Sequence, residues 1–181
     1  AIAKLAAETA IINNCRTNGL DASIVRPFNV AGPRQSPRGG FVLPRFIQQA
    51  TQNLPITVFG DGSALRAFTH VEDMASGIIH TMRNGKNGEA YNIGNPLNKT
   101  SIGELAKLVK SLLNSSSKII NLDGKEIYGP DYEEANDKFP DSTKAETELG
   151  WLAKHDIETV IHDATNDYFQ RLQDNVLKDK I

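Results

Sequence analysis

Cysteine is nearly absent from the sequence, since Cys15 is the single cysteine among 181 residues. One cysteine can form neither an internal disulfide bond nor a cysteine-based zinc site, which favours a reducing compartment. Apolar runs long enough to span a membrane are also absent, and the N-terminus lacks the basic and apolar segments of a secretion signal. We therefore expect a soluble, cytoplasmic protein.

Positive charge is not in excess. The chain has 20 Lys and Arg residues against 22 Asp and Glu residues, for a formal net charge of −2, and the two signs are mixed along the sequence. Without a basic stripe there is no surface suited to a nucleic acid or an anionic membrane, so we expect neither as a partner.

Several catalytic signatures are missing. The sequence has no Gly-x-Ser-x-Gly elbow, no Gly-Lys-Ser/Thr phosphate loop and no Gly-x-Gly-x-x-Gly turn. The histidines are dispersed, and no two of them have the spacing of metal ligands: His70, His80, His155 and His162. We therefore expect no metal site.

What is present is an alternation of helical and strand patterns, which predicts an α/β fold. An amphipathic helix is expected over residues 1–18, with Gly19 as its stop but no capping residue before its first turn. Residues 21–30 are rich in β-branched side chains and predict a buried strand of a parallel sheet. Further helices are predicted at residues 42–53, 72–84, 102–113, 142–149 and 156–175.

Short strands are predicted between these helices. Residues 55–59 and 66–71 indicate two strands about the tight turn 60–63, and strands are also expected at 89–94 and 117–123. Residues 124–140 are predicted to form a polar loop. Three short-range signals accompany these elements: Ser101 and Glu104 form a capping box, Asp61 serves a turn, and Asp73 caps the helix that follows it.

Four arginines lie beside Gly or Pro turns: Arg26, Arg34, Arg38 and Arg66. Guanidinium and backbone donors near strand ends can converge on an anionic ligand, because α/β sheets bind ligands outside the ends of their strands. A solvated surface role is the alternative for each of them.

Four blocks resemble one family. They are "RPFNVAGPRQ" (26–35), "PITVFGDGSALRAFTHVEDMASGI" (55–78), "YNIGNPLNKTSIGELAKLV" (91–109) and "FPDSTKAETELGW" (139–151). Their order and content are similar to the extended short-chain dehydrogenases that act on nucleotide sugars, the NAD-dependent epimerases, dehydratases and decarboxylases. The resemblance implies the last part of a doubly wound, Rossmann-like parallel sheet plus a smaller α/β substrate-binding domain. Residues 1–41 would belong to the NAD-binding domain, with strands near 66–94 returning to it, and 42–181 mainly to the substrate-binding domain.

The family's catalytic pair is Tyr-x-x-x-Lys on a long helix, and "AIAK" places Lys4 where its lysine would stand. The tyrosine would then precede Ala1, so we expect the chain to be the C-terminal part of a longer enzyme and to be inactive alone. Residues four apart share one helix face, so the lysine ammonium can lower the pKa of the tyrosine while also donating to the cofactor ribose. Without the resemblance, Lys4 would be one solvated helix lysine.

The resemblance also implies ligand-binding residues. Pro27 and Phe28 would approach the nicotinamide of NAD. The nucleoside-diphosphate sugar would be held by Asn29, Val42, Thr57, Phe59, Arg66 and Lys138. Asn29 and Arg66 match the sugar and diphosphate positions, while the residues of 42–59 match those that line the base and ribose. Alternatively, Asn29 merely ends a strand and Phe59 belongs to the core.

Two departures from the family pattern bear on the diphosphate. Ala67 stands where many relatives carry an aspartate, and Lys138 stands where many carry an arginine. A lysine offers a point charge and not a planar fork of donors.

The predicted function is the C-terminal portion of an NAD-dependent nucleotide-sugar epimerase that oxidises and reduces the sugar at C4. A 4,6-dehydratase or a uronate decarboxylase of the same family is the alternative within the class. A sugar-nucleotide-binding module without chemistry is the alternative of another class. The resemblance further implies a homodimer formed through the first helix, with Ile11, Ile12 and Cys15 facing the partner or the core.

Overall fold

The computed structural model describes residues 2–129, 131 and 137–178. Its helices are α1 (Ile2–Thr17), α2 (Val42–Thr51), α3 (Val71–Asn84), α4 (Ile102–Leu112), α5 (Gly124–Tyr128), α6 (Thr143–Leu149) and α7 (Ile157–Lys178). Its strands are β1 (Ile24–Pro27), β2 (Val30–Ala31), β3 (Ile56–Phe59), β4 (Leu65–Ala67), β5 (Thr69–His70), β6 (Ala90–Ile93), β7 (Lys99–Ser101) and β8 (Ile119–Leu122).

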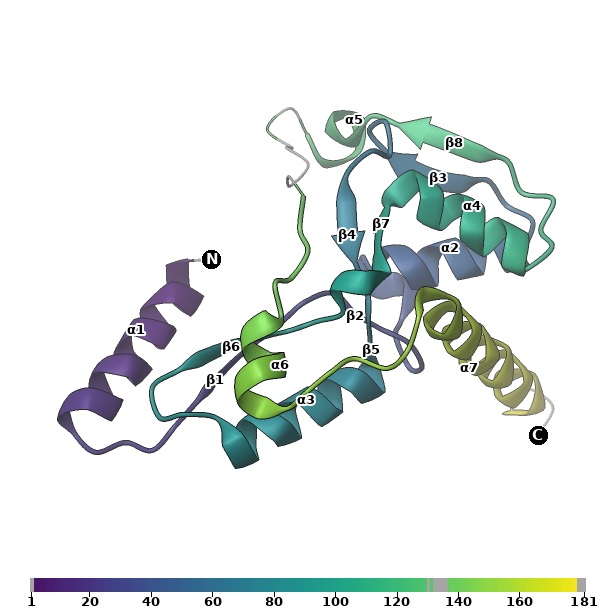
Figure 1. The fold of residues 1–181 in the computed structure, drawn as a ribbon. Helices are drawn as coiled ribbons and strands as arrows, with labels where there is room; N and C mark the ends of the chain where they lie inside the picture. Colours follow the sequence, from purple (N-terminus) through teal and green to yellow (C-terminus); the bar gives the residue numbers. More distant parts are fainter. Residues whose placement is uncertain (1, 130, 132–136, 179–181) are drawn as a thin grey trace.

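Parallel pairing dominates the strands, which confirms the predicted α/β class. β1 pairs with β6, β2 with β5 and β3 with β8, all in parallel, whereas β4 and β7 pair antiparallel. Figure 1 shows two groups of elements, with β1, β6, α3 and α6 in one and β3, β8, α2 and α4 in the other.

Each group has its own apolar core. The larger core joins α2, β3, α4 and α7 around side chains such as Phe46, Leu105 and Ile161. The smaller one joins α3, β6 and α6 around Tyr91 and Trp151. Hydrophobic burial of this kind is the main term that stabilises a domain.

The predicted strand 21–30 is divided in two at Asn29. This residue has a φ of 30°, a conformation that asparagine tolerates better than most residues. The backbone before it pairs with β6, and its own carbonyl accepts a hydrogen bond from the N–H of Thr69. The buried Thr69 hydroxyl donates to the carbonyl of Phe28 and accepts from the N–H of Asn95, so these backbone groups beside the break are satisfied.

The strands predicted on either side of the turn 60–63 are present, but they do not pair with each other. Instead, β3 pairs with β8, β4 with β7 and β5 with β2. The turn between them packs against the start of α4, where the N–H of Gly103 donates to the carbonyl of Gly62. A Cβ on Gly62 would lie 3.2 Å from the Gly103 backbone, so glycine is required for this close approach.

Helix α1 confirms the helix predicted for this segment. None of its described residues is buried, and Ile2 and Leu5 are 86% and 67% exposed. Glu8 ties α1 to β1 through an ion pair with Arg26 at 2.6 Å. Figure 1 shows α1 at the edge of the molecule.

The remaining predicted helices and strands are confirmed within a few residues. Ser101 caps α4 by accepting from the N–H of Glu104, and Gly150 ends α6 with a φ of 65°. The predicted loop 124–140 contains α5 in its first residues, capped by Asp123, and its residues 130 and 132–136 lie outside the described part of the chain. Along α7, the apolar side chains of Val160, Ile161, Ala164 and Tyr168 are buried, whereas Leu172 is 40% exposed. Within the described residues, no helix is both long and apolar enough to cross a membrane.

Candidate functional site

A cavity of about 750 Å³ opens between the end of β1, the loop after β2, the start of α2 and the strands β3 and β4. Its size is that of a small-molecule site. It is lined by Pro27, Asn29, Val30, Ala31, Gly32, Pro33, Arg34, Gln35, Gly40, Phe41, Val42, Leu43, Arg45, Phe59, Arg66, Phe68, Val71 and Ile102.

The loop after β2 is fixed by hydrogen bonds to α7. Arg34 has a φ of 68°, and its N–H donates to the carboxylate of Asp167. Arg171 donates to the carbonyl of Gln35, whose side chain donates back to the carbonyl of Val30. The loop is therefore held in one shape by residues more than a hundred positions away in the sequence.

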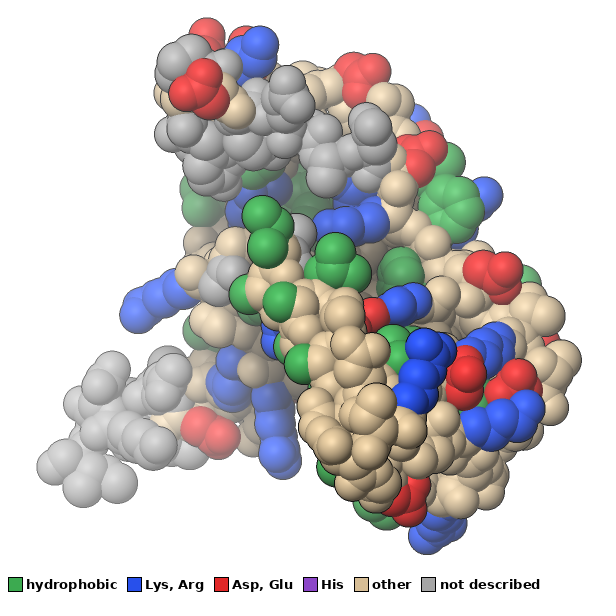
Figure 2. Space-filling view, turned by 90° about the vertical axis from the view of Figure 1, so that its left-hand side faces the viewer, with side chains coloured by type: hydrophobic (Ala, Val, Ile, Leu, Met, Phe, Trp, Pro, Cys, Tyr) green, Lys and Arg blue, Asp and Glu red, His purple; other side chains and the backbone are tan. Residues whose placement is uncertain are grey.

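The cavity carries positive charge. Three arginines line it, and none of the described lining residues is acidic. The Arg45 guanidinium lies 4.5 Å from the ring centre of Phe59 and donates to the carbonyl of Thr57. Arg66 donates to the carbonyl of Leu65. On the face drawn in Figure 2, Lys and Arg side chains lie together with hydrophobic ones in the recess in the upper part of the view. Such a wall suits an anionic ligand that also has an apolar part.

Asn29 contributes an unpaired donor to this cavity. Its side-chain nitrogen Nδ2 is shielded from solvent and has no hydrogen-bond partner. A buried donor without a partner costs free energy, which the Asn29 side chain would recover by turning Nδ2 toward a ligand acceptor in the cavity.

Five of the nine ligand-binding residues predicted from the sequence line this cavity: Pro27, Asn29, Val42, Phe59 and Arg66. Four of these residues lie on four different elements, β1, α2, β3 and β4, and Asn29 lies between β1 and β2. The other four predicted residues do not appear in its lining.

Three of those four, Phe28, Thr57 and Lys138, lie next to residues of the lining, whereas Lys4 lies on α1 at the edge of the molecule. The Thr57 hydroxyl accepts a hydrogen bond from the side-chain amide of Gln49. Phe28 packs against Gly94, since a Cβ added to Gly94 would lie only 2.9 Å from the Phe28 Cβ. Lys138 is exposed, and its N–H donates to the carbonyl of Leu65 next to Arg66. Lys4 is exposed on α1, one turn before Glu8.

Arg45 is a cavity residue that the sequence reading did not single out. It follows Val42 by three residues on the same helix, so the two side chains share one helix face. This three-residue spacing from Val42 is the feature of the sequence that could have identified Arg45 as a cavity residue. Arg26, in contrast, was predicted to join the anion-binding arginines, but it pairs with Glu8 outside the cavity lining. The hydrogen bonds from Arg26 hold the pKa of the Glu8 carboxyl below its ordinary value.

Two histidines that are far apart in the sequence lie together behind the cavity wall. His70 and His155 stack with ring centres 4.2 Å apart. His70, and not Asp73 as predicted, caps α3 by accepting from the N–H of Glu72. Asp73 is buried in the first turn and accepts from the backbone N–H groups of Lys154 and His155.

Comparison with known proteins gives three findings. Residues 1–94 match the model of the NAD dependent epimerase/dehydratase family. The chain is 40% identical over 146 residues to a UDP-N-acetyl-alpha-D-glucosaminuronate decarboxylase of Bacillus cytotoxicus, covering 80% of this chain and 44% of that protein. It is 31% identical to UDP-glucuronic acid decarboxylase 1 of Arabidopsis thaliana, covering 93% of this chain and 37% of that protein.

The fold is similar to that of a solved structure from Bacillus cereus, a UDP-glucuronic acid 4-epimerase in complex with UDP-glucuronic acid and NAD. The TM-score is 0.81 at 26% identity, and the match covers 93% of this chain and 52% of that one. The chain thus spans less than half the length of the two curated relatives above.

Proposed function

Because the chain belongs to the NAD-dependent epimerase/dehydratase family, we propose that it forms the substrate-binding part of an enzyme that acts on a nucleoside-diphosphate sugar with NAD as cofactor. The observation that carries this proposal is the cavity beside β2, whose described lining contains Asn29 and three arginines but no acidic residue. A diphosphate supplies negative charge and acceptor oxygens that suit such a lining.

The proposed roles follow the cavity wall. Arg66 and Asn29 hold the diphosphate, and Val42 with Phe59 contacts the base and ribose, where Arg45 lies over the Phe59 ring. Thr57 and Lys138 act from just outside this wall, Thr57 by placing Arg45 and Lys138 by adding a positive charge beside Arg66.

Lys4, Pro27 and Phe28 form the proposed NAD side. Arg26 on β1, which ends at Pro27, pairs with Glu8, and Lys4 lies one helical turn before Glu8 on α1. The exposed Lys4 ammonium fits a role in binding the cofactor ribose. NAD, when bound, supplies the hydride acceptor for C4 of the sugar.

The proposed domain division places residues 1–41 in the NAD-binding part and residues 42–181 mainly in the substrate-binding part. Two pairings support a return of the chain to the first part, since β5 pairs with β2 and β6 with β1. The exposed Ile2 and Leu5 and the half-buried Ile11 and Ile12 support a homodimer contact along α1.

The favoured reaction is decarboxylation of a UDP-linked uronic acid. Both curated relatives are named as decarboxylases of such sugars, and the carboxylate of a uronic acid adds a further negative charge to match the three arginines. A ketone formed at C4 lies β to that carboxylate, which can then leave as carbon dioxide. The second candidate is the 4-epimerase predicted from the sequence, which the similarity to the Bacillus cereus structure supports.

Incubation of the full-length enzyme with UDP-glucuronic acid and NAD tests the proposal. A decarboxylase releases carbon dioxide and a UDP-pentose, whereas an epimerase yields UDP-galacturonic acid of unchanged mass. Mass spectrometry and chromatography of the products separate the two. Binding of UDP without turnover by the full-length protein would instead indicate a module without chemistry. We expect the 181-residue chain to be inactive alone, because it contains no Tyr-x-x-x-Lys pair.

A further inference from the structure

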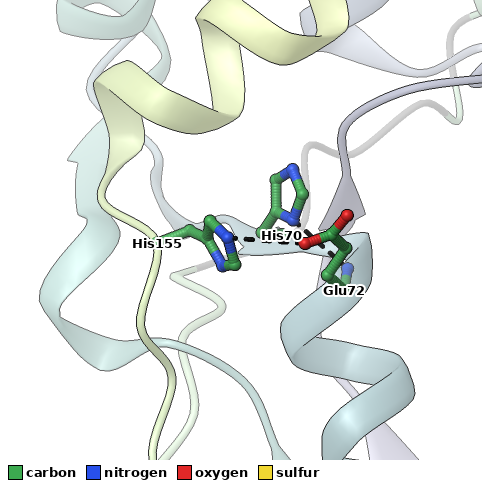
Figure 3. Close-up of side chains that lie close together, drawn as sticks. All are labelled: His70, Glu72 and His155. Atoms are coloured by element: carbon green, nitrogen blue, oxygen red, sulfur yellow. Dashed lines mark hydrogen bonds and ion pairs between the residues drawn. The ribbon is translucent and has the colours of Figure 1, made fainter.

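A cluster of His70, Glu72 and His155 lies behind the cavity and has no role in the proposed function. One possible ligand atom from each residue lies within 4.8 Å of the other two. Figure 3 shows the Glu72 carboxylate and the His155 ring pointing toward one another, with His70 beside them. The nearest of these contacts joins His155 Nε2 to Glu72 Oε2 at 3.6 Å. Such donors are the ordinary ligands of zinc.

The second nitrogen of each histidine faces a different carboxylate. His155 Nδ1 lies 2.9 Å from Asp73 Oδ1, and His70 Nε2 lies 3.5 Å from Asp163 Oδ2. Neither of these nitrogens makes a hydrogen bond in the present geometry. In a metal-bound histidine the second nitrogen commonly donates to such a carboxylate, which then orients the ring, and here a carboxylate lies near each of them. The nitrogens left on the Glu72 side are His155 Nε2 and His70 Nδ1.

Burial makes the site rigid on one side and adjustable on the other. His70 is only 1% exposed and its Nε2 makes no hydrogen bond, while the Glu72 side chain is 74% exposed. Ligand atoms about 2.1 Å from a tetrahedral zinc ion lie roughly 3.4 Å apart. The long, exposed Glu72 side chain can move toward such an ion. Because the rings of His70 and His155 stack at 4.2 Å and 26°, the His155 ring, which is 26% exposed, must also turn out of the stack so that both in-plane lone pairs reach the ion.

The ion would displace one existing interaction. His70 Nδ1 accepts a hydrogen bond of 3.2 Å from the N–H of Glu72. That loss is offset by charge, because Glu72, Asp73 and Asp163 surround the two imidazoles. Three carboxylates beside two imidazole rings favour a divalent cation.

We propose that His70, Glu72 and His155 bind a divalent transition-metal ion of the zinc type. Imidazole ligands favour zinc, cobalt or nickel over magnesium and calcium, which prefer oxygen ligands. The ion joins the first turn of α3 to the segment before α7. His70 also lies next to the cavity wall, since a Cβ on Gly32 would be 3.4 Å from His70 Nε2. The bound metal therefore stabilises the cavity wall and takes no part in the reaction.

Calorimetric titration of Zn²⁺ into metal-stripped, tag-free protein tests this site. We expect one ion per cluster, with the affinity reduced at least tenfold in Glu72→Gln and in His155→Gln. Glu104→Gln is the matched control, because Glu104 is likewise an exposed glutamate in the first turn of a helix. His80→Gln controls for binding by an unrelated histidine.

Visible absorption of added Co²⁺ gives a second readout that does not depend on stability. We expect ligand-field bands of a tetrahedral site in the parent protein and in the two controls, and their loss in Glu72→Gln, which leaves both histidines in place. The absence of Zn²⁺ binding, or binding that Glu72→Gln and His155→Gln leave unchanged, would overturn the proposal.

Discussion

Arg66 lies on β4, with its side chain at the cavity and its backbone next to Lys138. If it holds the diphosphate, Arg66→Ala should raise the KM for the nucleotide sugar about tenfold to a hundredfold and leave NAD affinity nearly unchanged. The reason is that a charge-assisted hydrogen bond contributes roughly 1.5–3 kcal/mol. Steady-state kinetics of the full-length enzyme measures this. Arg38→Ala is the control, because Arg38 lies outside the cavity lining. An unchanged KM in Arg66→Ala would mean that Arg66 has only a structural role.

Asp73 is the buried residue whose role the sequence reading missed. Its carboxylate accepts from the N–H groups of Lys154 and His155 and contacts the His155 ring. Asp73→Ala leaves these donors without a partner, so we expect the free energy of unfolding to fall by about 2–4 kcal/mol. Urea denaturation measures it, with the exposed Asp21→Ala as control. A loss no larger than that of Asp21→Ala would contradict the role.

The role of a single residue can be predicted from the sequence when its hydrogen-bond partner is only a few positions away. The turn at Asp61 and the cap at Ser101 are examples, because each side chain bonds a residue two or three positions away. Asp73 could not be read in this way, since its partners lie 81 and 82 positions further on. The contact between His70 and His155 could not be predicted for the same reason, because the two residues are far apart in the sequence.

Helix α1 depends on one ion pair more than on burial. Because Arg26 lowers the pKa of Glu8 in the folded state, the pair stabilises the contact above the ordinary glutamate pKa and is lost as the pH falls through the lowered value. The contact between α1 and β1 should therefore loosen below about pH 4, by no more than about 1 kcal/mol, since the pair is partly exposed.

Nitrogen-15 relaxation of α1 amides at pH 7 and at pH 3.5 checks this expectation. Motion should increase in the parent protein at the lower pH, whereas Glu8→Gln should be mobile at both. Equal rigidity of α1 at the two pH values in the parent protein would show that another contact holds the helix.

Helices were predicted more accurately than strand partners, for a physical reason. The periodicity of α2, α4 and α7 reflects burial of one face, which a short window of sequence records. Pairing of β3 with β8 joins Ile56 to Ile119, and nothing local in either segment specifies the other. The sequence therefore predicts that β3 is a strand, but its partner β8 is determined by tertiary packing.

The molecule as a whole brings its proposed ligand-binding residues together from separate elements. Pro27 ends β1, Val42 begins α2, Phe59 ends β3 and Arg66 lies on β4. The family resemblance predicted these four residues, but the sequence did not predict that α7 would fix the loop after β2 through Asp167 and Arg171. The cavity is thus a product of the complete packing, and its shape could not be derived from any one motif.

A crystal structure of the protein with UDP is the sharpest test of the proposed diphosphate site. The diphosphate should lie in the cavity of about 750 Å³ within hydrogen-bond distance of Arg66 and of the Asn29 amide, with the base near Phe59. UDP bound elsewhere on the molecule, with only solvent in this cavity, would contradict the proposal.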